Sequence, residues 1–104
     1  MADINSFHKA IGAVQTINVT TASAVGITTI AGQLLATKAR FTVVGDDIRY
    51  QYDGNDPTTG PSGVGHYVGN YFTFELFGHT NLDQFRMIAV SGTAIVTVQI
   101  EAPE

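Results

Sequence analysis

Apolar and polar residues alternate strictly in the stretch Val96-Thr97-Val98-Gln99-Ile100-Glu101. Successive side chains of a β-strand point to opposite faces of a sheet, so a strand here buries three aliphatic side chains and exposes three polar ones. Alternation of this kind is typical of an antiparallel sheet that has one face on a core and the other in water. The stretch therefore predicts a strand of an antiparallel β-protein.

The same period of two recurs in four other segments of the chain. They are Thr16–Thr20, Arg40–Val43, Ile48–Tyr52 and Tyr71–Leu76. A further run, Phe85–Val90, is apolar on both faces. Because a strand in the middle of a buried sheet is covered on both sides, this run predicts a central strand.

Short turn-forming segments separate these predicted strands. Gly45-Asp46-Asp47 and Ser91-Gly92-Thr93 are each predicted to join two strands as a short hairpin. Gly32-Gln33 is predicted to divide a further strand, Ile27–Ala31, from the short apolar step Leu34-Leu35. Many short strands at this spacing are typical of a sandwich or a small barrel.

The composition supports the same fold class. Thr, Val, Ile, Phe and Tyr occupy 42 of the 104 positions, whereas Leu, Glu and Lys occupy nine. Branched and aromatic side chains fit a pleated, half-buried surface, so this imbalance favours strands over helices. We predict that residues 1–104 form one all-β domain, an antiparallel β-sandwich of jelly-roll-like type with seven or eight short strands. Residues 1–12 are an N-terminal arm, or residues 3–11 form one helical turn, and both alternatives stay open.

The predicted core consists of inward-facing residues of these strands. They are Phe41, Phe72, Phe74, Phe85, Val96 and Val98. Tyr50 and Tyr52 share the inward face of their strand and are expected to fill the core, whereas Tyr67 and Tyr71 are expected to contact a partner.

Several classes of function are excluded by what the chain lacks. It contains no cysteine, which removes disulfides, zinc–thiolate sites and cysteine nucleophiles. Its net charge is −4 and its five basic residues are scattered, so a nucleic-acid partner is not expected. No apolar run is long enough to span a membrane, and no basic and then apolar leader is apparent at the start.

One predicted connection is unlike the others. Residues 53–65 form a 13-residue segment with four glycines and two prolines. Loops of this length in small domains tend to be functional or mobile. We therefore predict that this loop and the strands beside it contact a partner. The candidate residues are Asp53, Asn55, Asp56, Pro57, Pro61, His66, Tyr67 and Tyr71.

Two interpretations of the acidic residues around this loop are open. Asp46, Asp47, Asp53, Asn55 and Asp56 either supply oxygen ligands to calcium or cap turns through their own backbone. The turn interpretation is favoured because the spacing matches no known calcium-binding loop. Whether the loop binds calcium or a sugar is left open by the sequence.

No catalytic or metal-binding pattern stands out. The three histidines, His8, His66 and His79, show no ligand spacing, so no metal site is predicted. The chain has neither a nucleophile elbow nor a phosphate-binding glycine loop, so no catalytic residue is assigned and no enzyme or cofactor is expected.

A set of four pieces in fixed order carries a family resemblance. The stretch Ile48-Arg49-Tyr50-Gln51-Tyr52-Asp53-Gly54-Asn55-Asp56-Pro57-Thr58 precedes Gly65-His66-Tyr67-Val68, and Leu82–Ala89 precedes Ala94–Val98. This order resembles a family of small virion structural proteins of tailed bacteriophages and prophages. Those proteins carry Ile/Val-Arg-Tyr/Trp-Arg-x-Asp-Gly-x-x-Pro-Thr, then a glycine, Leu-x-x-Phe-Arg-x-Ile and a closing strand. The likeness covers residues 34–101, and the segment between Thr58 and Gly65 is longer here than in that pattern.

The resemblance implies a structural role and no chemistry. A capsid decoration or cement protein is expected, made in the bacterial host cytoplasm and carried on the virion. Its expected partners are the major capsid protein, or another virion protein, and further copies of itself, with a trimer favoured. The alternative is a carbohydrate-binding or receptor-binding module of a phage tail or head fibre, because tyrosines suit sugar stacking.

Overall fold

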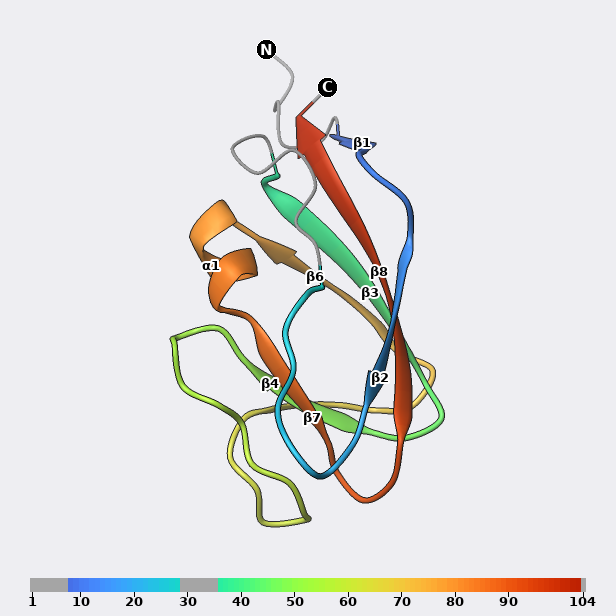
Figure 1. Ribbon diagram of the computed structural model, residues 1–104, viewed down its shortest axis with the longest axis vertical. Helices are drawn as coiled ribbons and strands as arrows, with labels where there is room; N and C mark the ends of the chain where they lie inside the picture. Colours follow the sequence, from blue (N-terminus) through green and yellow to red (C-terminus); the bar gives the residue numbers. More distant parts are fainter. Residues whose placement is uncertain (1–7, 29–35, 104) are drawn as a thin grey trace.

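The computed structural model describes residues 8–28 and 36–103. Strands account for 47% of these residues and helix for 7%, and eight strands form two antiparallel sheets. The predicted class, an all-β antiparallel sandwich, is confirmed. Figure 1 shows the two layers, with the long strands of the larger sheet running beside the shorter strands of the smaller one.

The larger sheet has five strands but is only four strands wide, because two short strands share one edge; we call these four positions its columns. Its strands are β1 (His8–Ala10), β2 (Gln15–Val19), β8 (Ala94–Pro103), β3 (Lys38–Val44) and β6 (Thr73–Phe77). The strand order is β1-β8-β3-β6, and β2 also pairs with β8. β1 meets residues 101–103 of β8 and β2 meets residues 94–98, so the two short strands lie end to end along one edge of β8.

The smaller sheet has three strands. They are β5 (His66–Val68), β4 (Ile48–Gln51) and β7 (Arg86–Ala89), in the order β5-β4-β7. The prediction of a central strand at Phe85–Val90 is wrong, because β7 ends this ladder. Met87 and Ala89 are nonetheless fully buried. The segment 20–25 covers that edge of β7, with backbone hydrogen bonds from Ala89 to Thr20 and between Val25 and Met87.

Both predicted hairpins are wrong in the same way. Gly45–Asp47 leads from β3 to β4, and Ser91–Thr93 leads from β7 to β8, so each turn carries the chain from one sheet to the other. The partners of β3 are β6 and β8, which are distant in sequence. Turn composition therefore predicted the positions of these two turns correctly, but it did not predict which strands pair with each other.

The core lies between the two sheets. Of the predicted core residues, Phe41, Phe85, Val96 and Val98 are fully buried and Phe74 packs against them, half-buried. Phe72 is 66% exposed, and its prediction is wrong. The cause is Tyr71, whose φ of 72° breaks the extended backbone before β6 begins at Thr73.

Three elements lie outside the predicted strands: β1, β5 and the short helix α1 (His79–Gln84). Leu82 anchors the helix, because its side chain is buried and its amide donates to the carbonyl of Gly78. Residues 8–10 form a strand and not part of a helical turn, and residues 1–7 of the predicted arm lie outside the described residues. Ile27 and Thr28 are not in a strand, and residues 29–35, which include the predicted Gly32-Gln33 division and Leu34-Leu35, also lie outside them.

Candidate functional site

The long loop, residues 53–65, is held by the side chain of Arg49 on β4. Its guanidinium donates from Nη2 to the carbonyl of Pro61 at 3.0 Å, from Nε to Gly60 and from Nη1 to Gly65, both at 3.4 Å. Arg49 also lies 5.2 Å from the ring centre of Tyr67, a cation–π distance. One half-buried cation thus fixes three backbone positions of the loop.

A second anchor joins the loop to the end of β7. The Thr59 hydroxyl donates to the carbonyl of Ala89 at 2.6 Å, and the amide of Gly60 donates to the carbonyl of Val90 at 3.0 Å. Within the loop, Thr58 and Val64 exchange two hydrogen bonds of 2.9 and 2.6 Å. Residues 58–64 are therefore a closed turn that packs on its own domain.

The predicted partner-contact residues differ in exposure and do not all lie together. Asp53, Asn55, Asp56, Pro61, His66 and Tyr67 are exposed on the loop and on β5. Pro57 is buried, because it packs under Gly65 and beside Arg49, so its ring faces its own domain. Tyr71 is 77% exposed and lies beside the last residues of β3, where its amide donates to the carbonyl of Val43.

Of the acidic side chains, Asp53 bonds within its own turn, whereas Asp47 bonds to residues far along the chain. The Asp53 carboxylate accepts the amide of Asn55 at 3.0 Å, which lowers the pKa of Asp53. Asp47 accepts the amide of Asn70 at 2.7 Å and the hydroxyl of Tyr67, and this second bond raises the pKa of Tyr67. Among residues 8–28 and 36–103, no three acidic or histidine side chains gather as a metal site would require.

A ladder of aromatic rings runs from the core to the loop. Phe41 stacks on Phe74 at 4.5 Å, Phe74 stacks on Tyr50 at 4.7 Å, and the ring of Tyr50 lies 5.1 Å from His66. Tyr52 lies 5.8 Å from His66 with the two rings 15° from parallel. His66 is the exposed end of the ladder, and the half-buried Tyr52 beside it immediately precedes Asp53 in the chain.

A second surface lies on the outer face of the larger sheet. Four threonines stand side by side across its four columns, with Thr16 opposite Thr97, Thr97 opposite Thr42 and Thr42 opposite Thr73. We call these four residues the threonine row. The neighbouring pair on one side of the row, Val44 and Ile95, is 38% and 45% exposed.

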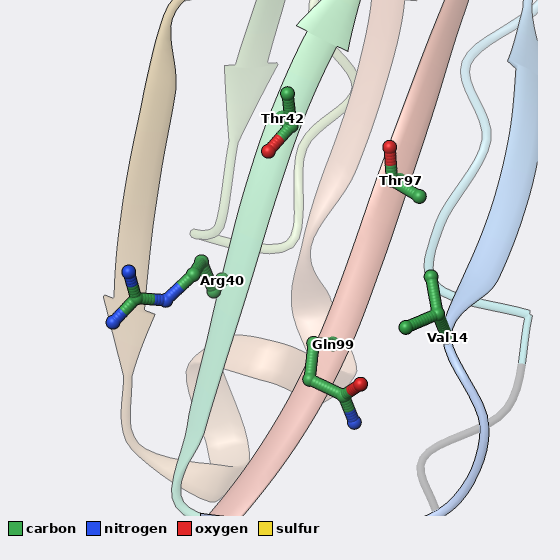
Figure 2. Close-up of a pocket in the computed structure, with 5 residues that line it drawn as sticks. All are labelled: Val14, Arg40, Thr42, Thr97 and Gln99. Carbon is green, nitrogen blue, oxygen red and sulfur yellow. The ribbon is translucent and has the colours of Figure 1, made fainter.

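On the other side of the threonine row lies a hollow of about 270 Å³ (Figure 2). Its lining residues are Val14, Arg40, Thr42, Thr97 and Gln99. The hollow exists because the chain leaves β8 between β1 and β2, at Gly12 with a φ of 74°. The amide of Gln99 bridges the gap by donating to the carbonyls of Ile11 and Gly12 at 3.5 and 3.4 Å.

Ion pairs border the hollow. Glu75 Oε2 lies 2.9 Å from Lys38 Nζ and 2.8 Å from Arg40 Nη2, and Glu101 lies 3.6 and 3.7 Å from the same two cations. The contact with Lys38 is the largest cause that lowers the pKa of Glu75. Two positive and two negative groups thus neutralise each other at this end of the sheet.

The sequence did not predict how residues are arranged at the loop or on the outer face of the larger sheet. The threonine row and the aromatic ladder each combine residues from three or more strands, and their positions depend on strand order. The sequence offered one indication of the role of Arg49: it is the only cation close before a long loop whose backbone carbonyls need hydrogen-bond donors.

Comparison with known proteins gives no relative: no family model, curated protein or solved structure matches this chain. In the part of the chain described by the structure, no helix is long and apolar enough to cross a membrane.

Proposed function

We propose that this chain is a non-enzymatic structural protein of a tailed-bacteriophage virion that decorates the capsid in many copies. The resemblance of Ile48–Thr58, Gly65–Val68, Leu82–Ala89 and Ala94–Val98 to phage virion proteins supports this proposal. The observation that carries it is the loop at 53–65, which projects from the sandwich (Figure 1) and is fixed by Arg49.

A fixed loop suits attachment to a large, preformed surface. Ordering a flexible segment on binding costs conformational entropy, and the contacts of Arg49 and Thr59 impose that order before binding. The exposed tip carries little charge, so contacts to a partner are made mainly by shape and backbone groups. Weak individual contacts are sufficient when many copies attach to one lattice.

The first test of this role is a count in purified virions. Quantitative mass spectrometry should find on the order of hundreds of copies per particle, as repeated lattice attachment requires. A handful of copies supports a tail-tip or fibre role instead. Absence of the chain from virions of the phage whose genome encodes it overturns the proposal.

The second test changes the tip of the loop without disturbing its anchors. Val64 is 59% exposed, and its backbone, not its side chain, bonds to Thr58. Val64→Arg should abolish attachment to capsids that have been stripped of the protein. The matched control is Thr80→Arg on exposed α1, which should attach normally. Equal occupancy by both variants rules out the loop tip as the contact.

A carbohydrate-binding role is the second candidate, and the aromatic ladder favours it. The exposed ring of His66 lies nearly parallel to the half-buried ring of Tyr52, the residue that precedes Asp53. Aromatic faces that stack on a sugar, with a carboxylate that accepts its hydroxyls, are a common way to bind carbohydrate. Binding of host cell-wall oligosaccharides that is lost in Tyr52→Ala supports this role, and no binding to a panel of such sugars excludes it.

A further inference from the structure

The outer face of the larger sheet is arranged in three successive rows. The threonine row stands in the middle, with Thr42 opposite Thr97. On one side of the row, Val44 and Ile95 lie two positions away from Thr42 and Thr97 along their strands. On the other side, Arg40 and Gln99 lie two positions away and line the hollow. An apolar ridge and a hollow thus lie at equal spacing from the same central row.

We propose that this face pairs with the same face of a second copy about a two-fold axis along the threonine row. A half-turn about that axis keeps each residue over its own strand and reverses the strand direction. Ile95 of one copy then lies over Gln99 of the other, and Val44 lies over Arg40. The ridge of each copy enters the hollow of its partner, as a self-complementary two-fold interface requires.

The chemistry of the two opposed rows is compatible with this pairing. Ile95 enters a hollow that Val14 borders with an exposed aliphatic side chain, 56% exposed. Val44 meets Arg40, whose guanidinium is engaged by Glu75, so the aliphatic stem of Arg40 is left for packing. Two facing sheets stack about 10 Å apart with their strands nearly aligned, a spacing that threonine side chains on both faces can fill.

The charges on this face do not oppose the approach of an identical copy. Its cations, Lys38 and Arg40, are paired with Glu75 and Glu101 at 2.8 to 3.7 Å. The face is therefore close to neutral although the chain carries a net charge of −4. Like-charge repulsion, which excludes many self-contacts, is small here.

The pairing is expected to be weak. Four columns about 4.8 Å apart and seven residues at about 3.3 Å give a footprint of roughly 400 Å², about half of what each partner buries in a standard stable complex. Association is therefore expected at high micromolar concentration. This inference depends on the sheet register and not on the proposed virion role, because the loop at 53–65 lies outside the face.

Cross-linking tests the axis directly, because the chain has no native cysteine. The two-fold axis places Thr97 of one copy opposite Thr97 of the other. Thr97→Cys at high micromolar concentration should form a covalent dimer with a short bis-maleimide cross-linker, because sheets stacked about 10 Å apart keep the two Cα atoms beyond disulfide reach. Ser62→Cys, on the exposed loop, is the control and should remain mainly monomeric. Equal cross-linking of both variants, or none of Thr97→Cys, overturns the proposal.

Sedimentation equilibrium on uncross-linked protein gives the second measurement. The unmodified chain should dimerise, Ile95→Glu should weaken the dimer at least tenfold, and Val64→Glu should leave it unchanged. Circular dichroism should show that all three are folded. A monomer at millimolar concentration, or a trimer that Ile95→Glu leaves intact, overturns the two-fold pairing. Loss of capsid attachment in Val64→Arg with an intact dimer separates this inference from the proposed function.

Discussion

The Asp46 carboxylate is bound to Ser91, 45 residues further along the chain. Asp46 Oδ2 accepts the amide of Ser91 at 3.0 Å and that of Gly92 at 2.7 Å, and Oδ1 accepts the Ser91 hydroxyl at 3.3 Å. Each residue stands at a corner where the chain crosses between the sheets. The carboxylate therefore ties together the two crossings, β3 to β4 and β7 to β8, at one end of the sandwich.

Asp46→Ala should destabilise the domain by about 0.5–1.5 kcal/mol, because it removes the acceptor of two exposed backbone amides and leaves water as the replacement partner. Urea denaturation followed by tyrosine fluorescence measures the change. Asp83→Ala, on the exposed face of α1, is the control and should alter the free energy of unfolding by less than about 0.5 kcal/mol. Equal effects of the two substitutions contradict a special role for the Asp46 contacts.

The phenylalanines offer a matched test of the core. Phe85 is fully buried against Phe41, and Phe72 is 66% exposed beside Gly69. Phe85→Ala should cost about 3–5 kcal/mol, close to the whole stability of a small domain, because it removes a large side chain from a packed core. Phe72→Ala should cost less than about 1 kcal/mol. Thermal unfolding of both proteins checks this order, and a larger loss in Phe72→Ala contradicts the exposure that the structure gives it.

Local pattern predicted most strands because alternation is a property of a few consecutive residues. Lys38–Val44 and Ala94–Pro103 each contain the predicted run, and Ile48–Gln51 ends one residue before its predicted run does. Sheet membership was not predictable in this way. The turn at Gly45–Asp47 has the composition of a hairpin, but β3 finds better-matched partners in β6 and β8, far along the chain.

The candidate site was predictable only in part. Loop length identified residues 53–65 because length is visible in the sequence. The anchoring contacts were not visible, since Arg49 binds backbone carbonyls, and every residue has one. Phe72 and Pro57 were misjudged for a related reason: one positive φ at Tyr71 and the packing of Gly65 against Pro57 decide which side chains are exposed.

Acid should weaken the larger sheet through Glu75. Its folded-state pKa is lowered, first by the hydrogen bond from Lys38, so the contact stabilises the fold above the ordinary glutamate pKa of about 4.3. That stability is lost as the pH falls through the lower folded-state pKa. Melting temperatures measured between pH 7 and pH 2 should fall less steeply for Glu75→Gln than for the unmodified protein. Identical slopes contradict the contribution of this pair.

Arg49→Met should loosen the loop at 53–65 while the sandwich stays folded. The substitution keeps an unbranched apolar stem on β4 but removes the donors to Gly60, Pro61 and Gly65, and charge-assisted bonds of this kind are among the stronger ones in proteins. Hydrogen exchange measured by mass spectrometry should accelerate at least tenfold in peptides from the loop and remain unchanged in peptides from β8. Arg49→Lys should be intermediate, because one ammonium group does not reproduce the planar three-way contact. If exchange in the loop is the same in all three proteins, the anchor at Thr59 holds the loop alone and the role given to Arg49 is wrong.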